Sequence, residues 1–233
     1  MSDMRSINNI NDLYDLLDAR FPSVSFDRMY ADRQRQAPFI TQNELPDENL
    51  AAFLDQYPKP FRALELGCGE GRNAVYMAER GVDVTAIDVS PVAVKHAMEI
   101  VERRGVKVHF LAENIFKANL ERHAYSFVYD SGCFHHLTPH RRLSYLELLD
   151  HVLEPGGYFG LTCFAWGENC ADEVDDWAFY DGRHVGVAFT EERLCDFFGA
   201  KYETITVRKY RNGVPGTIQG LEFMWACLFR KKI

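Results

Sequence analysis

The sequence predicts an α/β fold, a doubly wound, mostly parallel seven-stranded sheet that ends in an antiparallel C-terminal hairpin. Three observations lead to this prediction. Short apolar, β-rich runs alternate with helical patterns from Arg62 onward, a glycine-rich bend follows the first run, and two strand-like runs follow one another near the C-terminal end. Parallel strands need crossover connections, so regular alternation indicates helices on both faces of the sheet.

The middle of the chain accounts for the parallel strands and their helices. Strands are expected at 61–66, 82–88, 106–112, 125–130 and 158–165. Helices are expected at 71–80, from Pro91 to about Arg104, from Thr138 to about Leu153, and from near Thr190. Pro91 and Pro139 suit the first turn of a helix, where the missing N–H has no intrahelical partner, and the run Glu154-Pro155-Gly156-Gly157 is typical of a helix end.

The C-terminal end departs from this alternation. Residues 202–210 and 216–232 are both strand-like, and Asn212-Gly213 between them is a dipeptide typical of a two-residue hairpin turn. We therefore expect an antiparallel strand to complete the sheet.

The N-terminal end looks helical instead, at 10–21 and 45–57. We expect residues 1–58 to form a helical cap that packs over the ligand end of the sheet, because such helices cannot bury their apolar faces alone. Residues 59–233 would form the α/β core of the same single domain, 1–233.

Composition argues against several classes of partner. The 34 acidic side chains exceed the 26 basic ones, giving a formal charge of -8, which disfavours binding to nucleic acid or anionic lipid. No run approaches the roughly 18 apolar residues of a membrane span, and the N-terminus lacks the apolar core of a signal peptide. The six cysteines include no C-x-x-C pair, so neither a disulfide framework nor a zinc site is expected. These features favour a cytoplasmic protein; the sequence leaves open whether it is a monomer or a homodimer.

Gly67, Gly69 and Gly71 stand at alternate positions directly after the first predicted strand. In an open α/β sheet, the loop after this strand lies at the carboxyl edge, where ligands bind. The dinucleotide fingerprint G-x-G-x-x-G would have its last glycine at position 72, which is Arg72 here. The spacing therefore favours a ligand without a pyrophosphate and argues against a nicotinamide-dependent oxidoreductase.

Asp88 ends the second predicted strand, close to the same edge. A carboxylate at this place can accept hydrogen bonds from the diol of a ribose. An alternative role is to cap the helix that begins at Pro91, but Ser90 is better placed for that.

These segments resemble the class I S-adenosylmethionine-dependent methyltransferases, a Rossmann-like family, over most of the chain from Phe61 to Ile233. The motifs that carry the resemblance are LELGCGEGRN, AIDVS, AENIF, FVYDSGCFHHL and LEPGGYF. The likeness implies that Glu65 faces the methionine amino group, that Asp88 holds the ribose, and that Asn114 contacts adenine. The cofactor-binding residues that it implies are Glu65, Leu66, Gly67, Cys68, Gly69, Asn73, Asp88, Val89, Asn114, Ile115, Asp130, Ser131 and Gly132.

Within the family, the chain looks most like small-molecule enzymes of the tellurite-resistance and thiol or halide methyltransferase type. The segments FDRMYADRQRQAPF, GCFHHLTPHRR and GVAFTEERLCDFF occur in the order of that group. Two features depart from the family pattern: Asn114 stands where Asp is common, and Phe26 and Phe39 stand where the group often has Trp. The likeness implies S-adenosyl-L-methionine as cofactor and a small-molecule acceptor, favoured to be a thiol, a chalcogen or another soft nucleophile.

Methyl transfer from a sulfonium needs a base only when the acceptor is protonated at neutral pH. The segment YDSGCFHHLTPH should lie where the methyl group emerges, and His135 is the candidate for a catalytic base or an acceptor-positioning group. In the alternative interpretation, one histidine of the pair bonds a backbone group and the other packs under the cap. Candidate acceptor-binding residues are His136, Trp166, Arg183 and His184; the aromatic loop around Trp166 could equally pack on itself.

Other interpretations remain open at this point. The chain could bind S-adenosylmethionine without turnover, or it could methylate an oxygen or nitrogen of a small metabolite. A metal site at His136 and His140 is not expected, because Pro139 starts a helix between them. Cys133 is more simply a packed thiol than a nucleophile, since methyl transfer needs no covalent enzyme intermediate. The N/D-P-P-Y/F signature of base-amino methyltransferases is absent at 130–133.

Overall fold

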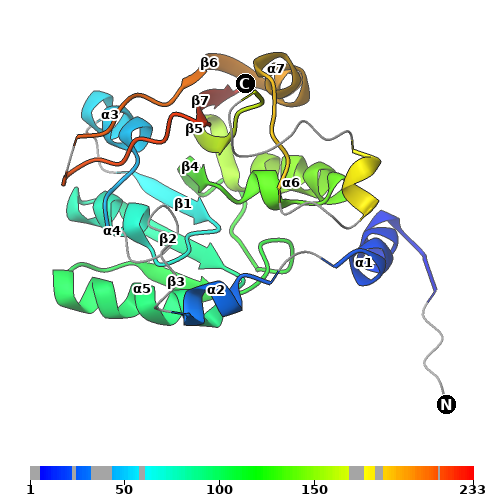
Figure 1. Cartoon of the computed structure of the whole chain (residues 1–233), viewed down its shortest axis with the longest axis horizontal. Helices are drawn as coiled ribbons and strands as arrows, with labels where there is room; N and C mark the ends of the chain where they lie inside the picture. Colours follow the sequence, from blue (N-terminus) through cyan, green and yellow to red (C-terminus); the bar gives the residue numbers. More distant parts are fainter. Residues whose placement is uncertain are drawn as a thin grey trace.

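A computed structural model describes residues 6–22, 25–32, 44–57, 61–167, 176–181, 186–214 and 216–233 of the chain. Within these ranges, seven strands form one sheet in the order β3-β2-β1-β4-β5-β7-β6 (Figure 1). The strands are β1 Arg62–Leu66, β2 Asp83–Asp88, β3 His109–Ala112, β4 Tyr125–Ser131, β5 Leu153–Phe164, β6 Tyr202–Lys209 and β7 Met224–Lys231. The first five pair in parallel, and β7 runs antiparallel to β5 and β6, which confirms the predicted fold class.

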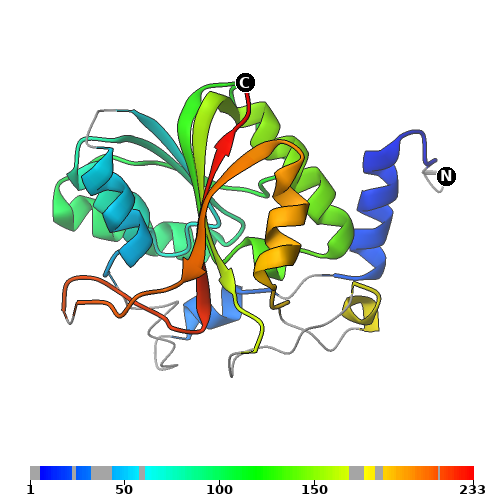
Figure 2. The ribbon, with the colours of Figure 1, turned by 90° about the horizontal axis from the view of Figure 1, so that it is seen from above.

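Helices cover both faces of the sheet (Figure 2). The helices are α1 Ile10–Arg20, α2 Asp27–Ala31, α3 Glu48–Gln56, α4 Arg72–Glu79, α5 Pro91–Arg104, α6 Pro139–Val152 and α7 Glu191–Gly199, with short 3-10 turns η1 Phe134–His136 and η2 Ala178–Asp181. On one face α3 and α4 share an apolar cluster with the sheet, and on the other α6 and α7 share a larger one. The sheet is thus buried on both sides.

The order of strands reverses between β1 and β4, which lie side by side although a long stretch of chain separates them. In such sheets, ligands bind beyond the carboxyl ends of the strands at this point of reversal. We therefore expect a ligand site at the carboxyl ends of β1, β2 and β4.

Strand β5 begins earlier than predicted, at Leu153. The register with β4 shifts between the pairs Tyr125↔Leu153 and Phe127↔Tyr158. The Glu154–Gly157 segment is therefore a bulge inside the strand pairing, with Gly156 at a φ of 78°. It ends α6, as predicted, without forming a separate turn.

The predicted two-residue turn at Asn212-Gly213 is wrong. Asn-Gly hairpins use a type I′ turn, which needs positive φ at both central residues, and Gly213 is not among the glycines with positive φ. The connection instead runs from Tyr210 to β7, and its backbone pairs with the segment before α3: Glu48 N–H donates to Gln219 and Gln219 N–H donates to Pro46. This pairing uses residues that the sequence pattern assigned to a longer final strand.

The three N-terminal helices pack on three different parts of the core, whereas the sequence predicted one cap over the ligand end. α1 lies against α6, α2 lies beside α5 at the ligand end, and α3 packs on the sheet (Figures 1 and 2). In the described part of the chain, none of the helices has the length and apolar character needed to cross a bilayer.

Candidate active site

The bend after β1 is built from three left-handed glycines. Gly67, Gly69 and Gly71 have φ values of 68°, 53° and 79°, a region that other residues enter at a cost of about 1–2 kcal/mol. Space is also lacking: a Cβ at Gly67 would lie 2.6 Å from the Cβ of Cys133, and one at Gly71 would lie 2.9 Å from the Cβ of Ala97. Both the turn and the close packing require glycine.

Asp88 at the end of β2 faces this bend. Its Oδ2 accepts a 2.8 Å hydrogen bond from Gly69 N–H, and its Oδ1 accepts one of the same length from Ser90 N–H. Burial raises the pKa of the Asp88 carboxyl, although the two backbone N–H groups oppose that shift. Helix α5 is capped by the Ser90 hydroxyl, which accepts from Ala93 N–H, so Asp88 does not serve as the cap. The bend and the acid meet at one sheet edge, as the sequence predicted.

Glu65, on β1, is a buried carboxyl with one oxygen that lacks a partner. The side chain is 1% exposed, and Oε2 has no hydrogen bond among the described residues. Burial raises the pKa of Glu65 to about 8; the Arg72 cation opposes the shift, the Asp47 anion adds to it, and bonds from Asn73 and the Ala74 backbone lower it slightly. A buried oxygen without a partner indicates a missing donor or cation.

Arg72 and Asp47 form a buried ion pair beside Glu65, with 2.5 Å between Nη1 and Oδ1. Arg72 also donates to the Leu45 carbonyl and to Ser131 Oγ, and Ser131 in turn donates to Asp47 Oδ2 at 2.6 Å. Tyr129 donates to the same carboxylate oxygen at 2.8 Å. This network joins α3, α4 and β4. The sequence pattern does not reveal this network, because Arg72 and Asp47 are far apart in the chain and belong to no common motif.

The end of β4 carries the three residues expected near the methionine end. The Asp130 carboxylate is fully buried and accepts from Tyr145 Oη at 2.6 Å and from the N–H groups of Cys133 and Phe134. Burial raises its pKa to about 7, against these bonds. The carboxylate is thus used inside the core, and only the backbone of Asp130 can line a ligand site, next to Gly132 at a φ of 95°.

His135 and His136 follow at once in η1, with their Nε2 atoms 3.0 Å apart. His135 is 2% exposed, and its ring stacks on Phe164 with centroids 3.8 Å apart. The more accessible His136 ring packs against Phe26, which precedes α2, at 4.8 Å. Of the pair, His136 is therefore the ring beneath the N-terminal segment, and His135 is the ring in the core.

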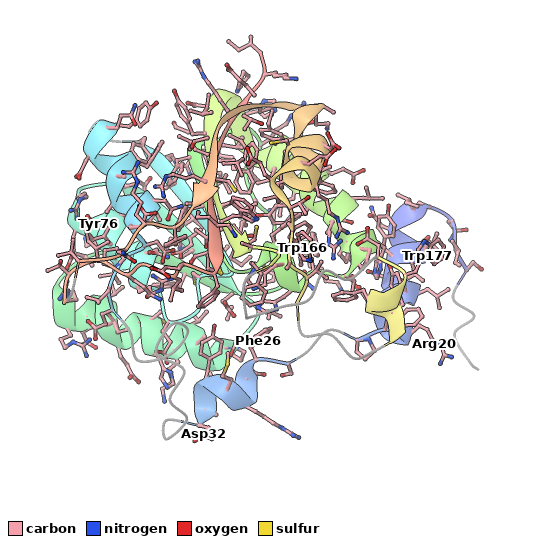
Figure 3. The ribbon with its side chains drawn as sticks, turned by 45° about the horizontal axis from the view of Figure 1, so that its top comes forward. Arg20, Phe26, Asp32, Tyr76, Trp166 and Trp177 are labelled. Carbon is pink, nitrogen blue, oxygen red and sulfur yellow. The ribbon has the colours of Figure 1, made fainter. Side chains whose placement is uncertain are left out.

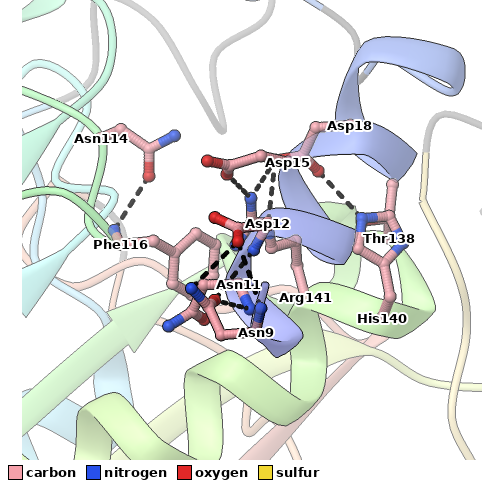
Figure 4. Close-up of polar contacts among 10 residues, drawn as sticks. All are labelled: Asn9, Asn11, Asp12, Asp15, Asp18, Asn114, Phe116, Thr138, His140 and Arg141. Carbon is pink, nitrogen blue, oxygen red and sulfur yellow. Dashed lines mark hydrogen bonds and ion pairs between the residues drawn. The ribbon is translucent and has the colours of Figure 1, made fainter. Parts of the chain in front are cut away.

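Asn114 lies at the end of β3, where the resemblance places adenine. Its Oδ1 accepts a 2.9 Å hydrogen bond from Phe116 N–H, which fixes the orientation of the amide (Figure 4). The Phe116 ring lies under the Arg141 guanidinium at 5.3 Å, and Arg141 bonds both Asp15 and Asp18 of α1. Helix α1 is thereby tied to the segment that follows β3, a link that the sequence pattern did not show.

The short helix α2 lies over the glycine bend. Tyr30 is 7% exposed, and its hydroxyl would be 2.8 Å from a Cβ at Gly69. Asp27 accepts a 2.5 Å hydrogen bond from Ser90 Oγ, which ties α2 to the end of β2. Burial raises the pKa of Tyr30 well above its usual value, and nearby Asp88 adds to that shift, so the hydroxyl stays protonated. Figure 3 shows Phe26 at the same end of the molecule.

The remaining predicted cofactor residues have mixed exposure. Leu66, Cys68 and Ile115 are buried, whereas Val89 is 63% exposed. Burial also raises the pKa of the Cys133 thiol well above its usual value, which keeps it neutral. A neutral thiol is a poor nucleophile, in keeping with a packed residue.

Of the predicted acceptor residues other than His136, only Trp166 lies in the described ranges. It is 50% exposed, and its backbone N–H donates to the Phe189 carbonyl. A second tryptophan of the same loop, Trp177, is 86% exposed and lies toward α1 (Figure 3). Arg183 and His184 lie outside the described residues. The structure therefore leaves the acceptor-binding role of this loop as a prediction.

No metal site is found in the ranges that the structure covers. They contain no group of three or more His, Cys, Asp or Glu side chains suited to a metal ion. His140, the possible partner of His136, instead lies 2.9 Å from Asp18 through its Nε2.

One family model matches the central part of the chain. It covers residues 63–157 and is described as a methyltransferase domain. Over 120 residues the chain is 34% identical to an uncharacterized methyltransferase of Synechocystis, which covers 52% of each protein. It is also 29% identical over 166 residues to the probable S-adenosyl-L-methionine-dependent methyltransferase TehB of Haemophilus influenzae, covering 64% of this chain and 58% of TehB. The chain thus spans about half the length of these curated relatives.

Solved structures share the fold at lower identity. One was determined in work on the conversion of a disulfide bond into a thioacetal group during echinomycin biosynthesis; it has a TM-score of 0.69 at 21% identity and covers 89% of this chain and 91% of its own. Another is 1,6-didemethyltoxoflavin-N1-methyltransferase of Burkholderia thailandensis with bound substrate and S-adenosylhomocysteine. It has a TM-score of 0.65 at 20% identity and covers 99% of this chain and 93% of its own.

Proposed function

Because this chain carries a class I S-adenosylmethionine-dependent methyltransferase domain, we propose that it transfers the methyl group to a small-molecule acceptor, favoured to be a thiol, a chalcogen or another soft nucleophile. The observation that carries the proposal is the direct bond between Asp88 and Gly69 N–H at the edge where β1 and β2 end. This places a carboxylate and a bare backbone bend side by side, which suits a ribose and its attached chain.

The residues present fit S-adenosylmethionine, the cofactor of this domain family. The partnerless Oε2 of buried Glu65 suits the ammonium group of a methionine, and Asp88 has lone pairs left for the ribose hydroxyls. Arg72 occupies the place of the third glycine and bonds Leu45 and Asp47 in the segment before α3, so the start of α4 is not bare backbone for a pyrophosphate. When bound, the cofactor supplies an electrophilic methyl group on a sulfonium.

The chain's own part in this reaction is to orient the reactants and exclude water. Orientation of two reactants can contribute about 7–11 kcal/mol to lowering a barrier. The ends of β1, β2 and β4 would hold the cofactor, while Tyr30 of α2 covers the bend and Phe26, just before α2, packs on His136. The proposed site residues are those predicted from the sequence, with the backbone rather than the carboxylate of Asp130.

Three features support a small-molecule acceptor. The toxoflavin-pathway neighbour of the same fold acts on a small heterocycle according to its name, and the formal charge of -8 disfavours nucleic acid. The relative TehB is named as a probable S-adenosyl-L-methionine-dependent methyltransferase, the class that the motifs resemble. We extend the proposal to a cytoplasmic location, which agrees with the five free cysteines of the described ranges, and to a monomer or homodimer.

Two measurements test the proposal. Isothermal titration with S-adenosylmethionine should show binding that Asp88→Ala weakens at least tenfold, while Asp83→Ala at the exposed start of β2 leaves it unchanged. Radiolabelled cofactor should then transfer its methyl group to a member of a panel of thiols, phenols and amines. Binding without transfer to any acceptor would indicate a binding module, transfer only to phenols or amines would indicate an O- or N-methyltransferase, and absence of binding would reject the proposal.

A further inference from the structure

The two adjacent histidines of η1 are held by contacts that fix their tautomers. A backbone N–H can only donate, and that of Phe164 donates to His135 Nδ1 at 3.3 Å. The neutral His135 ring must therefore carry its proton on Nε2. Burial, together with the neighbouring His136, lowers the pKa of His135 well below its usual value, so the ring is neutral.

The state of His136 follows from that of His135. Their Nε2 atoms are 3.0 Å apart, and the Nε2–H of His135 needs an acceptor there. His136 Nε2 must accept it, so the proton of the neutral His136 ring lies on Nδ1. A proton added to His136 would have to enter at Nε2, where it would face the N–H of His135.

The His135–His136 pair contacts three segments of the chain that are far apart in the sequence. His135 stacks on Phe164 at the end of β5, its carbonyl accepts from Val187 N–H at 2.9 Å, and His136 packs against Phe26. A Cβ at Gly186 would lie 3.2 Å from both rings. The rings therefore set the spacing between the end of β4, the end of β5 and the segment before α2.

Given the proposed methyl transfer, we propose that the His135–His136 pair positions the acceptor side of the site and takes no proton, and that the enzyme methylates an acceptor whose nucleophilic atom is already ionised when it binds. A proton added to His136 at Nε2 would break the hydrogen bond between the rings, and one added to His135 at Nδ1 would break the bond from Phe164 N–H. The acceptor anion attacks the methyl carbon, a new bond to that carbon forms, and the electron pair of the S–CH₃ bond stays on sulfur. The acceptor's proton has gone to solvent beforehand.

The other described groups near the methionine end agree with this assignment. Asp130 is enclosed in the core by Tyr145 and backbone N–H groups, the Cys133 thiol is neutral, and Tyr30 remains protonated. A thiol acceptor fits best, because thiols ionise far more readily than alcohols, with a pKa of about 8.5 for the thiol of cysteine.

A pH profile of methyl transfer tests the proposal. We would compare an alkyl thiol with an aryl thiol, which ionises at lower pH, in the wild type and in His136→Gln, whose amide oxygen can still accept from His135. The rising limb of kcat/KM should move with the pKa of the thiol and keep its shape in the variant, with a loss of less than about tenfold. A rising limb at the same pH for both thiols would overturn the proposal. So would loss of the limb in His136→Gln or His184→Gln together with a 10²–10⁴-fold fall in kcat/KM.

A second readout needs no acceptor and so separates this inference from the proposed function. The ¹⁵N shifts of the imidazoles at pH 7.5 should show His135 protonated on Nε2 and His136 protonated on Nδ1. His136 protonated on Nε2, with His135 protonated on Nδ1, would overturn the assignment even if methyl transfer is found. Absence of methyl transfer to any acceptor, with the expected tautomers present, would reject the proposed function alone.

Discussion

The proposed cofactor side and the proposed acceptor side of the site are built in different ways. On the cofactor side, Gly67, Gly69 and Asp88 lie within a short stretch of chain and are held by backbone geometry and two hydrogen bonds to backbone N–H groups. On the acceptor side, rings from the ends of β4 and β5 meet a segment from the N-terminus. The cofactor side is therefore set by local backbone structure, whereas the acceptor side forms only when distant segments of the chain pack together.

Between the two sides lies the Arg72–Asp47 network. It joins the start of α4, which belongs to the glycine bend, to the N-terminal segment and to Ser131. Substitutions in the glycine bend should therefore mainly weaken cofactor binding, whereas substitutions in the Arg72–Asp47 network should mainly lower the free energy of unfolding.

The largest effect on stability is expected for Arg72→Met. It leaves the Asp47 carboxylate buried without its cation, and breaking a buried pair from one side typically costs about 3–5 kcal/mol. Arg62→Met, which breaks the exposed pairs with Asp83 and Glu121, should cost about 0–1 kcal/mol. Urea unfolding followed by circular dichroism measures both. Equal losses in the two variants would mean that the network does not join the two sides.

The next effect concerns cofactor affinity. Gly67→Ala adds a Cβ at 2.6 Å from that of Cys133 in a left-handed conformation, so it should weaken S-adenosylmethionine binding at least a hundredfold. Gly105→Ala is a matched control, because its φ of 67° is almost the same but no atom lies within 4 Å. Gly105→Ala should lose about 1–2 kcal/mol of stability from strain, and Gly67→Ala should lose more, because the Cys133 side chain must also move. If the control weakens binding as much in calorimetry, local strain rather than the bend explains the loss.

The smallest predicted effect is a pH dependence of cofactor affinity through Glu65. Its pKa of about 8 means that the free protein holds a neutral carboxyl at pH 6–7, and the cofactor's ammonium favours the anion. The dissociation constant should therefore fall by about tenfold per pH unit between pH 6 and 7.5, with release of a proton. Calorimetry in two buffers of different ionisation enthalpy measures the proton.

Glu65→Gln supplies the control for that dependence. It should bind more weakly and show no pH trend, since Gln cannot ionise. The same pKa shift makes the unliganded fold lose stability as pH rises from about 4.5 toward 8, because the folded state holds a proton that the unfolded state has released. A flat affinity in the wild type would contradict the assignment of Glu65 to the ammonium.

The sequence is sufficient to place those site residues whose position depends on local structure. Gly67, Gly69 and Asp88 could be placed because glycine spacing and strand ends determine them, and the parallel core followed from periodicity. The Arg72–Asp47 pair, the Arg141 link to α1 and the wide C-terminal connection could not, since each depends on partners far apart in the chain. The Asn212-Gly213 turn failed because pairing with residues 46–48 outweighs a local turn preference.

A crystal structure with bound S-adenosylhomocysteine tests the central claim most directly. We predict both ribose hydroxyls within hydrogen-bond distance of Asp88 and the ammonium group within hydrogen-bond distance of Glu65 Oε2, with the glycine bend in its present conformation. A ligand bound elsewhere, or one that reaches neither carboxyl group, would contradict the account.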